Sequence, residues 1–443
     1  MPLPPGWPLT AIFVFFPVWW ALGLSEFILP ILAVPMALHL LRRAPIKVPP
    51  GFGIWMLFLL WVVVGAVVLN VNPPDTLPGS AASRSIAFTH RLVNYLAVTV
   101  AMLYIGNLSE RELPRYRLIR MLGIFFMITV AGGLLAIARP TFEFTSPFEM
   151  LLPSSLTANP YVQSLVHPAV AQIQDVLGFD APRPKAPFDY TNTWGNNLSI
   201  LGIWFVVGWW ARRPVNPRSR LFAAAVVLAA VIPAVYSLNR GMWIGVGLSL
   251  GYVALRLAAR GRVAVLGALA VAVAVGLLIF AVSPLHTVVE ERLENPRSNE
   301  IRATLSIQAV QHAADSPIIG YGSTRTALGS NESIAIGRSS SCPQCGNFTI
   351  GSNGHLWFLL IANGFVGAAL YVLFFLGVAW RYRRDVTPIG IAGTLVALLA
   401  LFYGLFYNAL VTPLLLYLTS VALLWRNETH RREEEAREGG GAA

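Results

Sequence analysis

Long apolar stretches recur along the whole chain and limit it to one broad class of fold. A helix needs about 20 consecutive apolar residues to cross the hydrocarbon core of a bilayer. Of the 443 residues, 56% are hydrophobic and 12% are charged, which is more apolar surface than a soluble protein of this size can bury. We therefore expect an all-α, polytopic membrane protein, a bundle of about 12 transmembrane helices. The expected spans are 9–23, 25–41, 52–70, 88–106, 120–138, 193–211, 221–237, 242–259, 263–282, 355–379, 388–406 and 412–425.

Basic residues lie in alternate connections between these stretches. Short connections that are rich in Arg and Lys stay on the cytoplasmic side, so the pattern predicts that both termini are cytoplasmic. Residues 1–10 contain no Lys or Arg, and we expect the first span to be a retained anchor. The net charge of +11 is then a signal of membrane topology, and no nucleic-acid partner is expected. The basic connections are 42–47, 111–120, 212–220, 256–262, 381–384 and 426–437.

The longest connections divide the chain into six segments. Two of them lie on the outer side and are too long to be simple links between helices. In order, we expect N-terminal transmembrane helices (1–138), an extracytoplasmic loop with an amphipathic helix (139–193), central transmembrane helices (194–282), a large extracytoplasmic loop with a Cys-x-x-Cys motif (283–354), C-terminal transmembrane helices (355–426) and a disordered cytoplasmic tail (427–443).

The first outer loop contains an amphipathic pattern. Apolar residues recur at spacings of one, three or four, and polar residues fill the other face. We expect a helix over 161–177 that lies in the outer membrane interface, with Pro168 as a point of bending. Two roles stay open, a lid over a lipid-linked substrate or a helix packed over the bundle. The apolar positions are Val162, Leu165, Val166, Val170, Ile173 and Leu177.

His355 begins one of the most apolar stretches of the chain, directly after the second outer loop. The preceding Gly354 lets another backbone segment approach closely. An ionisable imidazole at the boundary between water and lipid is a candidate for an active site. A histidine with a purely structural role is the alternative.

Two arginines are candidates for binding a phosphate on the same side. Arg240 is the only charged residue of the short turn 237–243, and its guanidinium lies near the membrane surface. Arg302 follows Ser298 and Asn299, either of which can cap a helix, so we expect Arg302 in the first turn. Free N–H groups at that position favour an anion. The alternatives are snorkelling for Arg240 and a solvated surface charge for Arg302.

The two cysteines, Cys342 and Cys345, lie in the second outer loop. An extracytoplasmic position favours oxidation, so a small local disulfide is our main prediction. A zinc site would need two further ligands at a workable spacing. The outer acidic residues form no dense cluster, so no divalent metal site is expected.

Several motifs, in this order, resemble the O-antigen ligase and polymerase superfamily. The segment 190–195 is similar to the Asn-x-x-Gly motif of many members, and 237–245 to their Ser-x-Ser-Arg-Gly-x-Trp-x-Gly turn. The segment 302–322 resembles Arg-x-x-x-Trp followed by Pro-Leu-x-Gly-x-Gly. The segment 354–367 resembles a span that starts with His-Asn and continues to Gly-x-x-Gly.

The resemblance covers residues 186 to about 380, and the remainder of the chain agrees only in its number of spans. Leu305 stands where the family commonly has Trp, and Leu356 follows the histidine where Asn is usual. These departures concern residues that would position the acceptor. The Cys-x-x-Cys motif is also not a feature that the family would predict.

The resemblance implies a metal-independent, inverting glycosyltransferase of the GT-C type, without a cofactor. Such enzymes move a glycan from a polyprenyl-pyrophosphate carrier to a hydroxyl of a cell-envelope glycan or glycolipid, on the extracytoplasmic side of the cell membrane. In this chain His355 would be the general base, and Arg240 and Arg302 would bind the pyrophosphate. Further implied contacts are Arg84, Arg91 or Arg325 with the phosphate, and Asn192 and Trp194 with sugar.

Two alternatives to a ligase stay open. A polysaccharide polymerase of the same superfamily would share these motifs. A transporter of polysaccharide or lipid also often has twelve spans, but it usually needs ionisable groups near the middle of the bilayer. The expected spans are almost free of charge, so the sequence favours a transferase over a transporter.

Overall fold

The computed structural model of this protein describes residues 4–43, 45–158, 160–175, 180–210, 216–261, 263–264, 266–267, 270, 297–327 and 348–440. Within these ranges the chain is mostly helical, so the predicted helical class is confirmed there. The expected disulfide between Cys342 and Cys345, and most of the expected span 263–282, lie outside the described residues. The strands form two small antiparallel sheets, β1 (Ala171–Asp175) with β2 (Asp180–Pro184) and β3 (Arg325–Thr326) with β4 (Thr349–Ile350).

Five helices in the described ranges are long and apolar enough to cross a membrane. Shorter apolar helices accompany them, and together they indicate a membrane-embedded protein. They coincide with eight of the expected spans, whereas the total of twelve stays a prediction. The long helices are α5 (Ala81–Asn107), α6 (Arg115–Ala138), α11 (Pro217–Tyr236), α12 (Arg240–Ala258) and α16 (His355–Tyr382), and the shorter ones are α3 (Ile28–Leu41), α4 (Phe52–Val64) with the 3-10 turn η1 (Gly65–Val68), and α17 (Pro388–Gly404).

The first expected span, 9–23, is divided into two short helices, α1 (Trp7–Phe13) and α2 (Phe16–Ala21). Pro17 has no N–H group, so it cannot continue the hydrogen-bonding pattern of α1. The sixth expected span corresponds to α10 (Thr191–Trp209).

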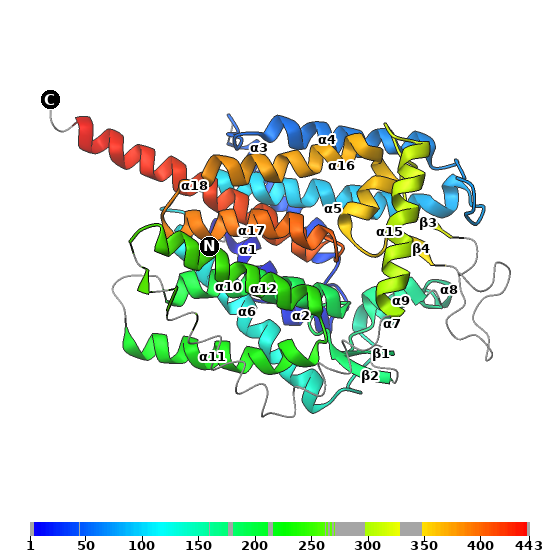
Figure 1. The fold of residues 1–443 in the computed structure, drawn as a ribbon, viewed down its shortest axis with the longest axis horizontal. Helices are drawn as coiled ribbons and strands as arrows, with labels where there is room; N and C mark the ends of the chain where they lie inside the picture. Colours follow the sequence, from blue (N-terminus) through cyan, green and yellow to red (C-terminus); the bar gives the residue numbers. More distant parts are fainter. Residues whose placement is uncertain are drawn as a thin grey trace.

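The C-terminal tail is helical, so the prediction of disorder is wrong for residues 427–440. The helix α18 (Thr412–Gly440) continues from the last apolar stretch and projects from the bundle (Figure 1). Ion pairs one helical turn apart support its polar part. Arg432 Nη2 lies 2.6 Å from Glu428 Oε1, and His430 Nδ1 lies 3.2 Å from Glu434 Oε2.

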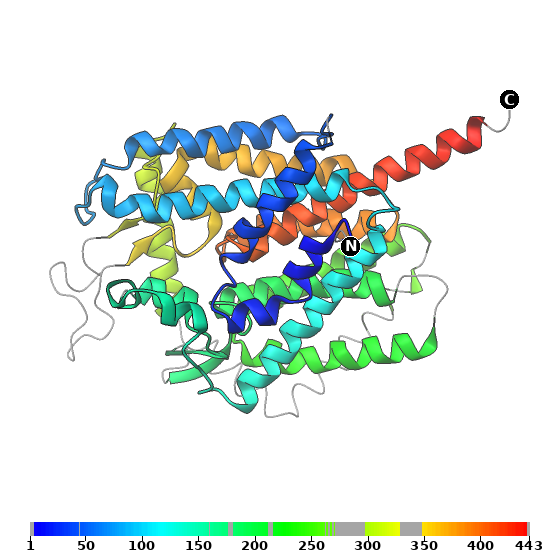
Figure 2. The same cartoon turned by 180° about the vertical axis from the view of Figure 1, so that it is seen from behind.

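The helix α16 is a central element of the bundle and packs against α4 and α17 (Figure 1). It is the most buried of the five long helices, whereas α11 and α12 are the least buried. The helix α6 packs against α10, and α5 packs against α18. Figure 2 shows the opposite face, on which the N-terminal helices lie; there α1 contacts α6 and α3 contacts α5.

The two ends of the bundle are named here by what they contain. The end at which His355 begins α16 is called the site end. The opposite end, from which α18 projects, is called the tail end. The N-terminus also lies at the tail end, because Gly6 N–H donates to Tyr104 Oη at 3.1 Å, near the last turn of α5.

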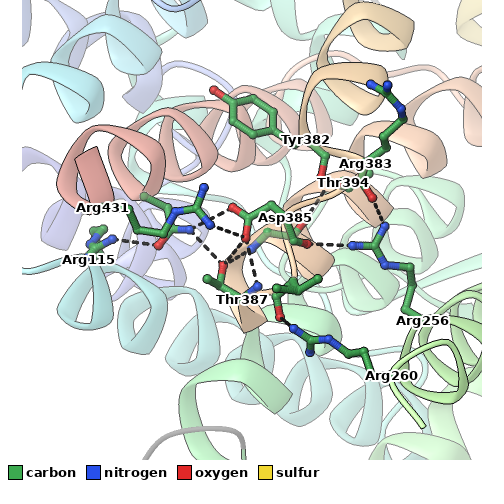
Figure 3. A network of polar contacts seen from close by, with 12 residues as sticks. Arg115, Arg256, Arg260, Tyr382, Arg383, Asp385, Thr387, Thr394 and Arg431 are labelled. Atoms are coloured by element: carbon green, nitrogen blue, oxygen red, sulfur yellow. Dashed lines mark hydrogen bonds and ion pairs between the residues drawn. The ribbon is translucent and has the colours of Figure 1, made fainter. Parts of the chain in front are cut away.

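A polar network around Asp385 links the ends of several helices at the tail end (Figure 3). The carboxylate of Asp385 accepts hydrogen bonds from Thr387 Oγ1 at 2.8 Å and from Asn427 Nδ2 at 3.1 Å. Arg256 of α12 donates to the backbone oxygen of Asp385 at 2.7 Å. Several of the basic connections that we expected on one side of the membrane therefore meet at this end. Further contacts there are Arg43 with Glu112, Arg115 with Asn427, and Arg426 with Glu110.

Residues 161–177 do not form the single amphipathic helix that we expected. The helix α9 (Pro160–Val166) ends before Pro168, which has no N–H group to donate within a helix. The following backbone pairs with neighbouring segments instead, through Val170 N–H to Phe142 O at 3.1 Å and through the β1–β2 hairpin. Two further short helices precede α9, namely α7 (Pro147–Leu151) and α8 (Ser154–Thr157).

The second outer loop docks into a break in α16. Gly364 has φ of 65° and ψ of −171°, so helical hydrogen bonding is interrupted there. The turn 317–322, which follows α15 (Arg297–Asp315), binds the backbone groups that the break leaves unpaired. This contact fixes α15 against α16. The bonds are Tyr321 N–H to Ile361 O (2.8 Å), Gly322 N–H to Ala362 O (2.7 Å) and Phe365 N–H to Pro317 O (2.8 Å).

Substitution of Gly320 tests this docking. Its φ is 70°, and a Cβ there would lie 2.5 Å from Gly364 N. We expect Gly320→Ala to lower the free energy of unfolding by about 2–4 kcal/mol, because both the left-handed backbone and the close contact oppose a side chain. Thermal unfolding in detergent measures this loss. Gly377→Ala in α16 is the matched control, because nothing lies within 4 Å of its Cβ position, and equal losses in both variants would contradict the docking.

Two carboxyl groups, one buried and one half-buried, join the N-terminal helices to the first outer loop. Glu26, in the turn between α2 and α3, is 8% exposed and shares a hydrogen bond with Asp189. Burial raises the pKa of Asp189 to about 6, although Glu26, Lys185 and Ser25 oppose the shift. Burial also raises the pKa of Glu26 well above its ordinary value, and the charge of Asp189 adds to that effect.

The raised pKa values of Glu26 and Asp189 predict that stability depends on pH. Folding takes up protons when a carboxyl pKa is raised in the folded protein. The stabilisation is complete below the ordinary pKa values of 4.5 and 3.8, and for Asp189 it is lost as the pH rises from there through about 6. We expect the thermal unfolding temperature to fall from about pH 4 to about pH 6, and to fall further at higher pH as Glu26 ionises. Glu26→Gln stays neutral and should flatten this dependence, whereas an unchanged slope would contradict the assignment.

Candidate active site

One turn contacts the three segments that carry our main candidate residues. Residues 405–408, here called the site turn, connect α17 to α18 at the site end. Carbonyl oxygens of this turn accept hydrogen bonds from His355 N–H at 2.8 Å and from Arg302 Nη1 at 3.3 Å. The tyrosine hydroxyl of the turn donates to the side-chain oxygen of the residue before Arg240. The structure thus brings the three residues together, while their catalytic roles stay predictions.

His355 is completely buried, with 0% of its surface exposed. Its Nε2 lies 3.2 Å from Tyr95 Oη of α5, and its Nδ1 lies 3.2 Å from Asn408 Oδ1 of the site turn. The rings of Phe358 and Tyr371 flank the imidazole, with centroids 5.7 and 4.9 Å away. Both ring nitrogens are therefore hydrogen-bonded, and a substrate hydroxyl reaches the imidazole only if one of these neighbours moves.

Arg302 lies beyond the first turn of α15, because the helix already includes Arg297, so our prediction of a first-turn position is wrong. Its carbonyl accepts a hydrogen bond from Asn353 Nδ2 at 3.2 Å, which ties α15 to the start of α16. Burial lowers the pKa of Arg302; Tyr407 opposes this shift and the positive charge of Arg240 adds to it. Because the two guanidinium groups repel each other, an anion bound between them would be stabilised.

Arg240 is the first residue of α12. The preceding Asn239 caps the helix, because its Oδ1 accepts a hydrogen bond from Met242 N–H at 3.4 Å. Gly241 permits the site turn to approach, since an added Cβ would lie 2.5 Å from Tyr407 Oη. Arg240 is thereby placed at the N-terminus of a 19-residue helix, whose free N–H groups also favour an anion.

A further guanidinium comes from the first outer loop, and our sequence analysis did not identify it. Arg183 of β2 is 6% exposed, and its Nε donates to Ser237 O at 2.7 Å, in the turn before α12. Its charge also acts on Tyr407 of the site turn. No sequence pattern marks Arg183, because its position depends on the β1–β2 hairpin that carries it to α12.

Arg91 lies on the α5 side of the site. Its guanidinium carbon is 4.5 Å from the centre of the Phe358 ring, which is a cation–π contact. Its Nη1 donates to Ser323 Oγ at 3.0 Å, in the turn that follows α15. Phe358 in turn flanks His355. Arg91 is therefore near enough to remain a candidate for assisting with the phosphate.

Arg325 connects the turn after α15 to the segment between η1 and α5, and Arg84 of α5 makes hydrogen bonds to that same segment. Arg325 is 2% exposed, and its donors bind backbone oxygens of its own turn and of Val71 at 2.9–3.3 Å. Arg84 donates to Leu69 O at 2.7 Å. Burial, with a smaller effect from the charge of Arg84, lowers the pKa of Arg325 to about 10. These contacts are structural, so we withdraw Arg325 from the substrate-binding residues and assign Arg84 to support of the segment before α5.

Trp194 is buried between α10 and α6, and its contact with sugar stays a prediction. It is 0% exposed in α10, and its Nε1 donates to Thr129 O of α6 at 3.1 Å. A Cβ at Gly133 would lie 2.6 Å from its ring, so the two helices meet closely there. Asn192 is half-buried in the first turn of α10, and its contact with sugar stays a prediction.

Tyr95 and Asn408, the two partners of the His355 ring, were also missed by the sequence analysis. Tyr95 lies within an apolar stretch, and a polar side chain in such a stretch often marks a functional site. Asn408 lies in the short connection between the last two expected spans, 388–406 and 412–425. Both could have been singled out as polar residues in or beside apolar stretches.

Neither the models of known protein families nor the curated protein sequences match this chain.

Proposed function

We propose that this protein is a membrane glycosyltransferase that moves a glycan from a polyprenyl-pyrophosphate carrier to an acceptor hydroxyl. The observation that supports the proposal most strongly is the convergence of His355, Arg240 and Arg302 on the site turn. These residues are far apart in the sequence and belong to three different helices. A base and two cations are the groups that transfer from a diphosphate carrier needs. The family resemblance of the same segments supports this interpretation.

In the proposed reaction, His355 takes the proton of the acceptor hydroxyl as its oxygen attacks the anomeric carbon. Arg240 and Arg302 bind the pyrophosphate and stabilise the negative charge that grows on it as it leaves. Attack from the face opposite to the leaving group inverts the anomeric centre. The polyprenyl chain stays in the membrane throughout.

The site end belongs on the extracytoplasmic side in this proposal, and both termini are cytoplasmic. Several basic connections meet at the tail end, and basic connections stay in the cytoplasm. Both ends of the described chain also lie at the tail end. The proposed acceptor is therefore a glycan or glycolipid of the cell envelope, outside the cell membrane.

Transfer by the purified protein tests the proposal. The protein in detergent is given a polyprenyl-pyrophosphate-linked glycan and a glycolipid acceptor, with no membrane gradient. We expect release of polyprenyl pyrophosphate that matches the extension of the acceptor. Extension of the carrier-linked glycan itself would identify a polymerase. Absence of turnover, together with movement of the carrier-linked glycan across proteoliposomes, would instead identify a transporter and contradict the proposal.

A further inference from the structure

The hydrogen bonds around His355 define which ring nitrogen carries its proton. Asn408 Oδ1 lies 3.2 Å from His355 Nδ1 and 3.3 Å from Leu410 N. A backbone N–H group only donates, so the amide atom that it meets is the oxygen. Because this oxygen only accepts, its bond with His355 requires a hydrogen on Nδ1. The lone pair of the neutral imidazole is then on Nε2.

The lone pair on Nε2 faces the hydroxyl of Tyr95, 3.2 Å away. Tyr95 is 1% exposed, and its backbone oxygen accepts a hydrogen bond from Thr99 Oγ1 at 2.7 Å. Thr99 Oγ1 itself accepts from Trp55 Nε1 at 2.8 Å, so this part of α5 is anchored to α4. A phenol and a sugar hydroxyl make the same kind of hydrogen bond to an imidazole lone pair. Tyr95 thus occupies the place at which an acceptor hydroxyl would meet the base.

We propose that Asn408 and Tyr95 are positioning residues for His355. Asn408 fixes the tautomer in which Nε2 is the base, and Tyr95 keeps that lone pair hydrogen-bonded until the acceptor hydroxyl displaces it. This inference rests on the proposed glycan transfer and adds two residues to it. A donor at the position of Asn408 would reverse the tautomer and turn Nε2 into a donor that cannot accept a proton.

In the transfer step two bonds break and two bonds form. The O–H bond of the acceptor breaks, and its proton forms a bond to Nε2 of His355. The acceptor oxygen forms the new bond to the anomeric carbon with the electron pair that the O–H bond releases. The bond from the anomeric carbon to the pyrophosphate oxygen breaks, and its electron pair leaves with the pyrophosphate. His355 becomes an imidazolium whose Nδ1–H still donates to Asn408, and it later returns the proton to water.

The tautomer of His355 can be measured without any enzymatic turnover. Solid-state NMR of protein with 15N-labelled histidine in lipid bilayers distinguishes a protonated from an unprotonated ring nitrogen, and loss of the signal in His355→Gln assigns the resonance. We expect hydrogen on Nδ1 and none on Nε2. In Asn408→Leu we expect a mixture of tautomers, whereas Asn408→Asp keeps the acceptor and the wild-type tautomer. Hydrogen on Nε2 of the wild-type protein would overturn the inference.

The kcat of Asn408 variants gives a second test of the positioning role of Asn408. The general base contributes about 10²–10⁴-fold to such a reaction, and a wrong tautomer forfeits part of this. We expect Asn408→Leu to lower kcat by about 10- to 100-fold, and Asn408→Asp to recover most of it. Asn427→Leu removes a buried amide at the tail end and is the matched control, with kcat unchanged. Equal kcat losses in the Leu and Asp variants of Asn408 would reduce Asn408 to a packing role and overturn the inference.

Tyr95→Phe tests whether the acceptor hydroxyl displaces the Tyr95 hydroxyl from Nε2 or whether the Tyr95 hydroxyl only supports the structure. Without the hydroxyl, the acceptor no longer competes for Nε2, so we expect KM for the acceptor to fall by about 2- to 10-fold with kcat unchanged. Tyr104→Phe also removes a buried hydroxyl from α5, at the tail end, and should change neither value. A lower kcat with unchanged KM in Tyr95→Phe would contradict the displacement.

Failure of this inference is distinguishable from failure of the proposed function. If His355→Ala abolishes transfer but NMR places hydrogen on Nε2, the transferase stands and the roles of Asn408 and Tyr95 fall. If NMR shows the expected tautomer but His355→Ala transfers normally, the local geometry stands and His355 is not the base. The NMR measurement on the wild-type protein decides the first point even if an Asn408 variant fails to fold.

Discussion

His355→Ala is expected to lower kcat for glycan transfer by about 10²- to 10⁴-fold, which is the usual contribution of a general base. The loss follows because the variant no longer has Nε2 as the proton acceptor. KM for the carrier-linked donor should change little, because Arg240 and Arg302 remain in place. Release of polyprenyl pyrophosphate at saturating donor and acceptor measures the effect.

A matched control separates chemistry from folding in this experiment. His167 lies in the first outer loop, where its Nδ1 is 2.9 Å from Glu149 Oε2, and the proposed site does not include it. We expect His167→Ala to keep a near-normal kcat. Because His355 is fully buried, its truncation also removes packing, so the thermal unfolding temperature of both variants is recorded alongside. A folded His355→Ala protein with normal turnover would remove His355 from the mechanism.

Removal of either proposed phosphate-binding arginine is expected to be the next largest effect. Loss of one preorganised donor to a developing negative charge typically costs about 10²- to 10³-fold in kcat. We expect a loss of this size in both Arg240→Ala and Arg302→Ala. The double variant should lose less than the product of the two single losses, because both side chains would act on the same pyrophosphate. Single-turnover measurements with carrier-linked donor separate this loss from slower product release.

Lysine variants separate the effect of charge from that of geometry, and a remote arginine serves as the control. Lysine keeps the positive charge but loses the planar fork, so Arg240→Lys and Arg302→Lys should recover only part of kcat. Arg117 is exposed in the first turn of α6, at the tail end, and Arg117→Ala should have no effect. Full recovery by lysine would mean that charge alone matters at that position. Multiplicative losses in the double variant would contradict a shared ligand.

Hydropathy predicted the apolar helices well, because the thickness of a bilayer fixes the length of the stretch that crosses it. It failed where a single residue interrupts a stretch, as Pro17 does between α1 and α2. The close approach expected at Gly354 is present, since an added Cβ would lie 2.7 Å from Gly404 O. Apolar residues one helical turn apart also face the interior from α15, with Leu305 at 5% and Ala309 at 0% exposure.

The segment 161–177 shows how a local pattern can mislead. Apolar residues at helical spacing predicted one helix, but Gln172 and Gln174 also alternate with Ile173, which suits a strand. Pairing with β2 decided between the two, and that pairing depends on residues farther along the chain. A similar long-range contact explains the glycines of the turn 317–322, which match the break at Gly364.

The candidate site was predictable only in part. His355, Arg240 and Arg302 follow recognisable motifs, whereas the site turn that gathers them contains no motif that we recognised. Its carbonyl oxygens make two of the contacts, and backbone groups are available to any sequence. For Arg325 the sequence misled in the opposite direction. An arginine in an outer loop suggested phosphate binding, but its donors bind backbone oxygens and connect two loops.

The position of a bound pyrophosphate decides whether Arg240 and Arg302 form one phosphate site beside His355. A structure of the protein with a polyprenyl pyrophosphate bound in a lipid environment would locate it. We expect the pyrophosphate to contact both Arg240 and Arg302 beside residues 405–408, on the side of the site where His355 lies. A pyrophosphate bound where neither guanidinium reaches it, or at the tail end, would contradict the proposed function.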